Sequence, residues 1–377
     1  MAAMVPSANR DDTVLVLGLG DLGMRVVDVL SRWPGGRLVT AARDEANARA
    51  VAGQAALVAA LCDGPRTVEP AHADLADGDG VAELLARVRP DAIVLAASRL
   101  TWWRVPEHAR SLPYGVWVPL HVPLVRAMMQ ACAAAGVDAP VVLLPFPDAL
   151  GPVLAGMGHA PATGAGNVLE MAAKLVAVVA ARSGVERDAV EVRLVAHHAT
   201  ERLAFSAFLS VAGTEGAPPG PPPLHASASV NGQTLPDDEV RELLMSAYPL
   251  LSGRGTHGLT AAATGATVAG LLSEEPRRLH VPAPGGRPGG YPVRISRAGI
   301  ELDLPDGMTE SDAVAINSVA ARWDGIERIE ADGSFVYTRW VSEELERTLG
   351  LRLERVEPGD CDAVADELMA RLAQPAA

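Results

Sequence analysis

The sequence predicts an α/β protein with an N-terminal, doubly wound parallel Rossmann sheet and a C-terminal α+β domain. A buried apolar run at 14–17 leads into the glycine-rich turn GLGDLG at 18–23, and a helical pattern follows. Short apolar segments then alternate with helical ones up to about residue 145, an order typical of a parallel sheet. With 377 residues, 49% of them apolar, the chain is long enough for two domains with large cores.

The turn at 18–23 has the spacing of a dinucleotide-binding motif. Gly18 allows a tight turn after the strand, Gly20 lets the backbone approach a pyrophosphate, and Gly23 lets helix and strand pack closely. The helix that follows, at about 21–33, offers free N–H groups to an anion. The alternative is a glycine-rich turn of another α/β protein. The expected contacts of a nicotinamide or flavin dinucleotide are Gly18, Gly20, Asp21, Leu22 and Gly23.

The end of the second strand bears on the choice between NAD and NADP. This strand is expected at 37–42, and Arg43 and Asp44 follow it. An acidic side chain there accepts hydrogen bonds from the ribose 2′-OH, whereas an arginine pairs with a 2′-phosphate. Arg43 therefore favours NADP, while Asp44 keeps NAD open.

Two further strand ends complete the predicted cofactor side. A third strand at 68–73 ends at Asp74, which is expected near the adenine or, alternatively, as a helix N-cap. A fourth strand at 91–97 ends at Ala97. Because ligands bind outside the carboxyl ends of the strands in open α/β sheets, both residues are candidate cofactor contacts.

The loop at 98–115 borders the same crevice. It carries the pair Trp102 and Trp103 together with Arg104 and Arg110, and a long helix at 117–135 and a strand at 140–145 follow it. One interpretation is a lid with two cations over the ligand. The other is a surface loop whose tryptophans pack on a neighbouring subunit.

Composition limits the partners and the compartment. The net charge is −14 and no run of Lys or Arg stands out, which argues against nucleic acid or an anionic membrane as partner. No apolar run reaches the length of about 18 residues that suggests a membrane span, and residues 1–12 lack the pattern of a signal peptide. Three widely spaced cysteines indicate a reducing compartment. We expect a cytoplasmic protein that acts on a small molecule.

A Gly/Pro-rich connection at 148–165 marks the expected domain boundary. The units are a dinucleotide-binding domain at 1–150 and a substrate and oligomerisation domain at 151–377. The second unit is expected to contain a helix at 167–183, strands at 189–196, 201–212 and 224–231, helices at 236–248 and 257–273, a hairpin at 292–304, a helix at 309–323, a hairpin at 326–338 and two terminal helices.

The order of these parts resembles the lactate and malate dehydrogenase superfamily over roughly residues 13–325. LHVPLVRAM at 120–128, LLPFPD at 143–148, GAGNVLEMAAK at 164–174 and VEVRLVAHH at 190–198 carry the match, after the glycine turn and the arginine-bearing loop. The resemblance implies a nicotinamide-dependent oxidoreductase, built as a homodimer or tetramer.

Hydride transfer to a carbonyl needs a proton donor that titrates near neutrality, and histidine is the natural choice. A carboxylate on its other ring nitrogen fixes the tautomer. Glu170 and His197 lie at about the separation of the acid and histidine in the superfamily, so we expect them to form the catalytic pair. His198 competes with His197, because adjacent strand residues face opposite ways. The alternatives are a first-turn helix acid and strand-end histidines bonded to backbone.

The residues around this pair depart from the superfamily pattern. Its aspartate becomes Glu170, its arginine three positions later falls at Ala173, and Lys174 stands next to it. Its asparagine in the long helix falls at His121. Lys174 is a candidate arginine substitute, proton relay or simple helix ion pair, and no metal site is expected. The candidate substrate contacts are Arg104, Arg110, His121 and His198, with Lys174 beside the catalytic pair.

The function expected from the sequence is reversible, NAD(P)-dependent reduction of a carbonyl, with NADP as the favoured cofactor. Because the residues that hold a 2-oxo acid in the superfamily are replaced here, the substrate is expected to differ from that of the superfamily. Two alternatives stay open: an imine-reducing dehydrogenase of the opine or saccharopine type, and a dinucleotide-binding protein without catalysis.

Overall fold

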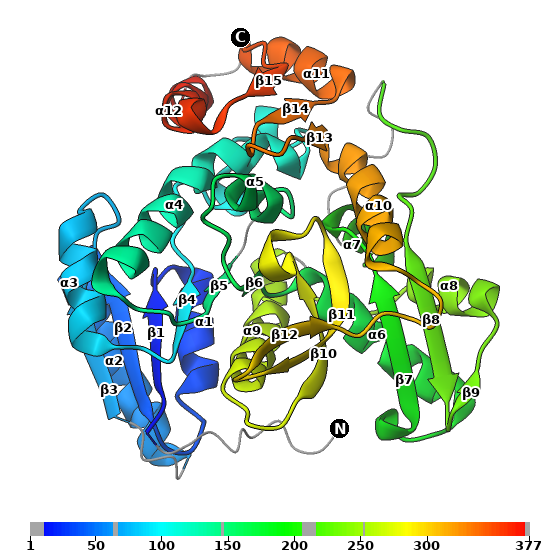
Figure 1. The fold of residues 1–377 in the computed structure, drawn as a ribbon, viewed down its shortest axis with the longest axis horizontal. Coiled ribbons are helices and arrows are strands. Elements are labelled where there is room, and N and C mark those ends of the chain that lie inside the picture. Colours follow the sequence, from blue (N-terminus) through cyan, green and yellow to red (C-terminus); the bar gives the residue numbers. More distant parts are fainter. Residues whose placement is uncertain (1–10, 63–66, 145–146, 206–215, 252, 374–377) are drawn as a thin grey trace.

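A six-stranded parallel sheet forms the N-terminal part of the molecule (Figure 1). The computed structural model describes residues 11–62, 67–144, 147–205, 216–251 and 253–373, and within these ranges the strand order is β3-β2-β1-β4-β5-β6. This order confirms the predicted doubly wound sheet. The strands are β1 (Thr13–Leu17), β2 (Arg37–Ala42), β3 (Thr67–His72), β4 (Ala92–Leu95), β5 (Val141–Leu143) and β6 (Thr163–Gly164).

Helices bury both faces of this sheet. Val14 and Val16 of β1 pack with α1 and with the later helix α9, whereas Leu15 and Leu17 pack with α3 and α4 on the other face. Such two-sided burial explains why the strand is a continuous apolar run and not an alternating one. The helices concerned are α1 (Asp21–Leu30), α2 (Glu45–Leu61), α3 (Gly78–Val88), α4 (Val118–Ala135) and α9 (His257–Leu271).

The glycine turn brings three chain segments into direct backbone contact. Gly18 has φ +99°, and a Cβ there would lie 2.3 Å from the amide nitrogen of Ala97, just beyond β4. A Cβ on Gly23 would lie 1.9 Å from the carbonyl oxygen of Gly18. The close packing predicted for this turn is therefore present. It places the start of α1 at the carboxyl end of β1.

Smaller antiparallel sheets and helices follow. Within the described ranges the sheets are β7-β8-β9, β10-β11-β12 and β13-β14-β15. Their strands are β7 (Val190–Val195), β8 (His225–Val230), β9 (Gln233–Thr234), β10 (Arg277–Pro282), β11 (Gly290–Ser296), β12 (Gly299–Leu302), β13 (Ile326–Ile329), β14 (Phe335–Tyr337) and β15 (Arg355–Val356). The helices are α5 (Leu150–Gly156), α6 (Asn167–Ser183), α7 (His198–Ala204), α8 (Asp237–Met245), α10 (Glu310–Ala320), α11 (Arg339–Leu349) and α12 (Cys361–Leu372).

Two details of the second half differ from the sequence prediction. The predicted strand at 201–212 is wrong over its described part, because residues 198–204 form the helix α7. The His197 side chain accepts a hydrogen bond from the Ala199 N–H and so caps this helix, a local interaction that overrides the apolar alternation. The remainder of that predicted strand, and the end of the one at 140–145, lie outside the described residues. Both predicted hairpins are confirmed.

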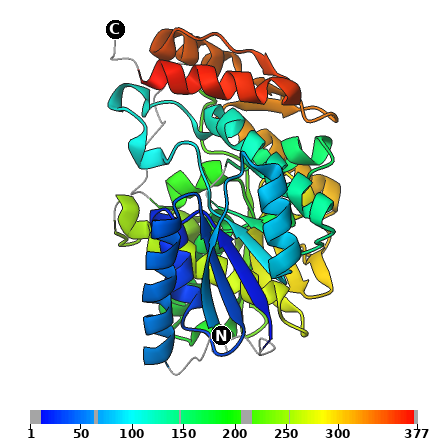
Figure 2. The ribbon, with the colours of Figure 1, turned by 90° about the vertical axis from the view of Figure 1, so that its left-hand side faces the viewer.

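The parallel sheet and the C-terminal segment cross the boundary expected at residue 150. Strand β6 pairs with β5 and therefore belongs to the first sheet. The last helix, α12, returns to pack on α4, where Arg126 pairs with Asp362 (Figures 1 and 2). The C-terminal elements thus cover the same side of the molecule as the loop that follows β4.

Within the described ranges, no helix has both the length and the apolar character needed to cross a bilayer.

Replacing Gly18 with alanine tests the close packing of the turn. The variant combines a positive φ with a backbone clash, so we expect its free energy of unfolding to fall by about 3 kcal/mol in urea denaturation. Gly53→Ala is the control, since a Cβ in that part of α2 would meet nothing within 4 Å. It should raise the free energy of unfolding by about 0.5–1 kcal/mol. Equal stability of the two variants would contradict the described turn.

Candidate active site

A cavity of about 610 Å³ opens at the carboxyl end of the parallel sheet. Leu22 of the glycine turn, the loop after β4 and the segment after β5 supply part of its wall. The starts of α6, α7 and α9 supply the rest, through residues such as Glu170, His198 and His257. Segments from both halves of the chain therefore meet here, at the place where open α/β sheets bind ligands.

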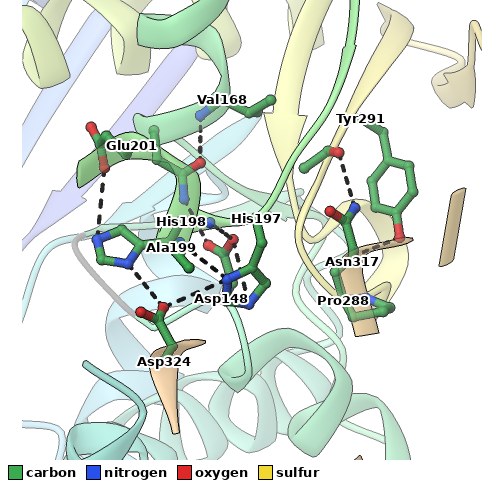
Figure 3. A network of polar contacts seen from close by, with 12 residues as sticks. Asp148, Val168, His197, His198, Ala199, Glu201, Pro288, Tyr291, Asn317 and Asp324 are labelled. Carbon is green, nitrogen blue, oxygen red and sulfur yellow. Dashed lines mark hydrogen bonds and ion pairs between the residues drawn. The ribbon is translucent and has the colours of Figure 1, made fainter. Parts of the chain in front are cut away.

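Of the adjacent histidines His197 and His198, His198 is the one that lines this cavity. Its Nδ1 lies 2.9 Å from Oδ2 of the buried Asp324, and its Nε2 lies 3.7 Å from Oε2 of Glu201 (Figure 3). The ring stacks on Tyr114 with centroids 4.6 Å apart, and the His198 N–H donates to Asp148 Oδ2 at 2.8 Å. A carboxylate on Nδ1 favours the tautomer with its proton there, which leaves Nε2 available for proton exchange.

His197 points elsewhere. It is 1% exposed and is not among the described residues that line the cavity. Its Nδ1 accepts the Ala199 N–H at 3.2 Å and lies 3.6 Å from Asp324 Oδ2, while its Nε2 lies 4.0 Å from Asp148 Oδ2. Since Nδ1 is already a hydrogen-bond acceptor, it carries no proton for Asp324. The structure therefore places His198, and not His197, between a carboxylate and the cavity.

Glu170 faces the cavity from the first turn of α6. Burial, and after it repulsion from Glu201, raise the pKa of Glu170 to about 8; a hydrogen bond from Thr260 and the nearby His198 oppose this rise. Burial beside Glu201 therefore favours the protonated form of this side chain. The structure brings Glu170 to the cavity with His198, but it places Asp324 on the ring nitrogen where the sequence analysis expected Glu170.

Lys174, one turn further along α6, binds backbone. Its Nζ donates to the carbonyl oxygens of Ala204, Leu244 and Ser246 at 2.5, 2.6 and 2.6 Å. Burial lowers the pKa of Lys174 to about 8, whereas these three acceptors favour the charged form. Lys174 is not among the described cavity residues. It joins the C-terminal ends of α7 and α8, where the helix dipoles favour a cation.

The other predicted substrate contacts divide between the cavity and the rest of the molecule. Arg110 lines the cavity, and its Nε donates to the Val105 carbonyl at 3.3 Å. Arg104, in the same loop, is exposed and is not among the described residues that line the cavity. His121 is buried within α4, also outside that lining, and burial lowers its pKa to about 3, so that its ring is neutral.

The glycine turn keeps the features that a pyrophosphate requires. Gly20 is the N-cap of α1 and has no side chain to cap it, and a Cβ there would meet nothing within 4 Å. The next residue, Asp21, adds a negative charge, but it accepts a hydrogen bond from His257 Nδ1 at 2.5 Å and pairs with Arg25 and Arg254. Burial raises the pKa of Asp21, yet the hydrogen bonds from His257 and Arg25 bring it below the ordinary value. The uncapped start of α1 fits an anion, and Arg25 and Arg254 offset the negative charge of Asp21.

The remaining cofactor candidates lie at the carboxyl ends of the strands, as expected. Arg43 is exposed directly after β2. The Asp44 carboxylate accepts the N–H groups of Ala46 and Asn47 and so caps α2. Asp74 similarly accepts the Ala76 N–H, and Ala97 touches Gly18. Of all the predicted cofactor residues in the described structure, Leu22 alone also lines the cavity.

The sequence analysis missed several residues at the site, among them Asp148, Glu201, His257 and Asp324. Asp148 follows a strand end, and a carboxylate at that position is a signal that could have been used. His257 lies far from the turn in sequence, yet it joins Asp21 to the loop after β4, since its Nε2 accepts from Trp102 Nε1 at 3.3 Å. Asp324 precedes a glycine near the end of a helix, which gives no signal of a contact 126 positions away.

Comparisons with known proteins identify the fold. No family model matches the chain, and no curated protein matches its sequence. Malate dehydrogenase from Cryptosporidium parvum has a TM-score of 0.55 and 14% identity, over 83% of this chain and 98% of that one. Malate dehydrogenase from Plasmodium falciparum in complex with NADH gives 0.54 and 12%, over 83% and 96%. Lactate dehydrogenase from Eimeria maxima with NADH and oxamate gives 0.53 and 12%, over 82% and 93%.

These similarities show that the chain has a Rossmann fold of the type seen in lactate and malate dehydrogenases. The low identity means that the fold alone is shared on this basis, so the chemistry has to be argued from the site.

The pH dependence of stability tests the placement of Glu170. Because its pKa is about 8 in the folded protein and near 4.5 otherwise, the folded state binds more protons in between. The contribution of this carboxyl to stability therefore falls as the pH rises from about 4.5 to about 8. Glu170→Gln should match the wild type in thermal unfolding at acidic pH and become the more stable protein as the pH rises. Glu107→Gln, an exposed position, is the control; parallel pH curves for the wild type and Glu170→Gln would refute the assignment.

Proposed function

We propose that this protein is a nicotinamide-dinucleotide-dependent oxidoreductase that interconverts a carbonyl and an alcohol of a small molecule. The observation that carries the proposal is the pair His198 and Asp324, 2.9 Å apart, in a cavity that reaches Leu22 of the glycine turn. A proton donor with an oriented ring thus lies in a cavity that Leu22 of the dinucleotide motif also lines. The dehydrogenase fold supports this reading.

The glycine turn would hold the pyrophosphate, with the N-terminus of α1 directed at it and Gly20 leaving room for close approach. Arg254, which lines the cavity and pairs with Asp21, places a positive charge beside this turn. When bound, a nicotinamide dinucleotide supplies or accepts the hydride. Two of the solved structures with this fold contain NADH, which supports a cofactor of this class here.

His198 would hold and move the proton at the substrate oxygen through Nε2. Asp324 accepts from Nδ1–H and stabilises the imidazolium that forms when the ring takes up a proton. The stacked Tyr114 fixes the plane of the ring, and Asp148 fixes its backbone through the His198 N–H. In this assignment His198 replaces His197, and Asp324 replaces Glu170 as the orienting acid. Lys174 holds helix ends and takes no part in the chemistry.

We further propose that NADP is preferred over NAD. Arg43 is exposed directly after β2, while the carboxylate of Asp44 accepts hydrogen bonds from the first turn of α2. Arg43 is therefore the side chain available to a group on the 2′ position of the ribose, and its guanidinium suits a phosphate there.

The resemblance to the superfamily also supports a homodimer or tetramer, and the free thiols of Cys62, Cys132 and Cys361 agree with a cytoplasmic protein.

Replacing His198 tests the proposed chemistry. His198→Gln should lower turnover by about 10²–10⁴-fold, because the proton donor is lost, while the affinities for NADH and NADPH stay within about twofold. Turnover is measured by dinucleotide absorbance with whichever ketone or aldehyde of a small panel the wild type reduces. Binding is measured by nucleotide fluorescence.

Two companion variants make the test specific. His197→Gln should retain most of the activity of whatever fraction folds, and Asp324→Asn should shift the pH profile of turnover, as expected for a positioning residue. Full activity of His198→Gln with loss in His197→Gln would return the role to His197. Dinucleotide binding without reduction of any carbonyl would favour a non-catalytic binding protein.

Replacing Arg43 tests the cofactor preference. Arg43→Ala should weaken NADPH binding about tenfold, the loss of one charge-assisted hydrogen bond, and leave NADH binding unchanged. Arg49→Ala is the matched control, because Arg49 is an exposed arginine on α2, close to Arg43 in the sequence, and pairs with Glu45. Equal NADPH affinity of the Arg43 variant and the wild type would remove the preference.

A further inference from the structure

The inner wall of the cavity is acidic. Glu170 and Glu201 both line it and are mostly buried, at 4% and 8% exposure, and both are close to the His198 ring. Glu201 comes within 3.7 Å of Nε2, the nitrogen proposed to exchange a proton with the substrate. The group that lies beside the reacting carbon would therefore face two carboxyl groups.

The cations lie at the outer edge. Among the described residues that line the cavity, the arginines are Arg110 and Arg254, and both are exposed; the Arg254 side chain is 59% exposed. Lys174, the cation nearest to Glu170 along α6, donates to three carbonyls outside the cavity. A carboxylate next to the reacting carbon would thus lie beside two acidic side chains with no buried cation to pair with it, which disfavours its binding.

Aromatic side chains form much of the remaining wall. Trp102, Trp103, Tyr114 and Trp117 all line the cavity, although aromatic residues make up only 4% of the sequence. The faces of such rings attract organic cations, and tryptophan does so most strongly. This second observation is independent of the carboxyl groups and indicates the same kind of ligand.

We infer that the substrate of this cavity is an amino ketone and its product the amino alcohol, with the protonated amine one or two bonds from the reacting carbon and held by Glu170 and Glu201. The inference rests on the proposed function and names its substrate class. In the reduction, the carbonyl carbon gains a hydride and its oxygen gains the proton of His198, while the nicotinamide is oxidised. The amine keeps its protons throughout and acts only in recognition.

The paired charges also assist the proposed proton transfer. An ammonium group beside the ring disfavours the imidazolium form of His198 and so favours passage of its proton to the substrate oxygen. Burial raises the pKa of Glu170 in the free protein, and binding of the ammonium favours its charged form, so that binding should release a proton.

A matched pair of probes tests the inference. Aminoacetone and pyruvate share a methyl ketone and differ in an aminomethyl group against a carboxylate. Their binding to the full chain is followed by tryptophan fluorescence, with and without NADH or NADPH. We expect aminoacetone to bind at least about tenfold more tightly than pyruvate. Calorimetry in two buffers of different ionisation enthalpy should show proton release with aminoacetone.

Variants assign the effect to the two acids. Glu201→Gln and Glu170→Gln should each weaken aminoacetone binding about tenfold, and neither should weaken the binding of pyruvate. Glu107→Gln, which removes an exposed acid from the loop after β4, should leave both affinities unchanged. Thermal unfolding confirms that each variant is folded.

The outcomes separate the inference from the proposed function. Tighter binding of pyruvate, equal affinities, or no amine binding at millimolar concentrations overturns the inference, whatever the dinucleotides do. If aminoacetone is preferred but neither NADH nor NADPH binds, the cavity has the inferred specificity and the proposed function fails. If a dinucleotide binds and pyruvate is preferred, the proposed function stands without the inference.

Discussion

The contact between Asp324 and His198 is the constraint on which the rest of the site depends. Asp324 is 2% exposed, and a carboxylate so buried is costly unless charged or polar groups compensate it. The His198 ring, whose Nδ1 lies 2.9 Å from Oδ2 of Asp324, provides that compensation. Because Asp324 lies just before β13 and His198 is the first residue of α7, this one contact joins two segments that are distant in the sequence.

The same segment also fixes the loop after β4. A Cβ on Gly115 would lie 2.4 Å from the Asp324 carbonyl oxygen, so the end of that loop packs directly on the backbone of the acid. Tyr114, the preceding residue, stacks on His198. At the other end of the loop, Trp102 donates to His257, which in turn bonds Asp21 in the glycine turn. The loop is therefore held at one end by His198 and Asp324 and at the other by the glycine turn.

These two anchoring points explain what the sequence could and could not predict. The glycine turn, the parallel strands and the hairpins are set by local patterns of glycine and apolar residues, and the structure confirms them. The contacts of Asp324 and His257 join distant segments, and no local pattern specifies such pairs. The choice between His197 and His198 depends on one residue of register, which is decided when the His197 side chain caps α7 and turns the next residue toward the cavity.

Asp324, and not Glu170, is the carboxylate at Nδ1 of the His198 ring. The departures from the superfamily pattern at Glu170 and Ala173 therefore have a different explanation. If Glu170 oriented the histidine, losing the arginine at Ala173 would leave a substrate site without a cation and would suggest lost chemistry. With Asp324 on Nδ1, the carboxyl of Glu170 is released from that role and becomes part of the cavity wall, beside Glu201. In the proposed mechanism, these substitutions would alter which charge is bound next to the reacting carbon, while the proton donor would keep an orienting carboxylate. Specificity and proton transfer would then be carried by different acids, so that one could change without the other.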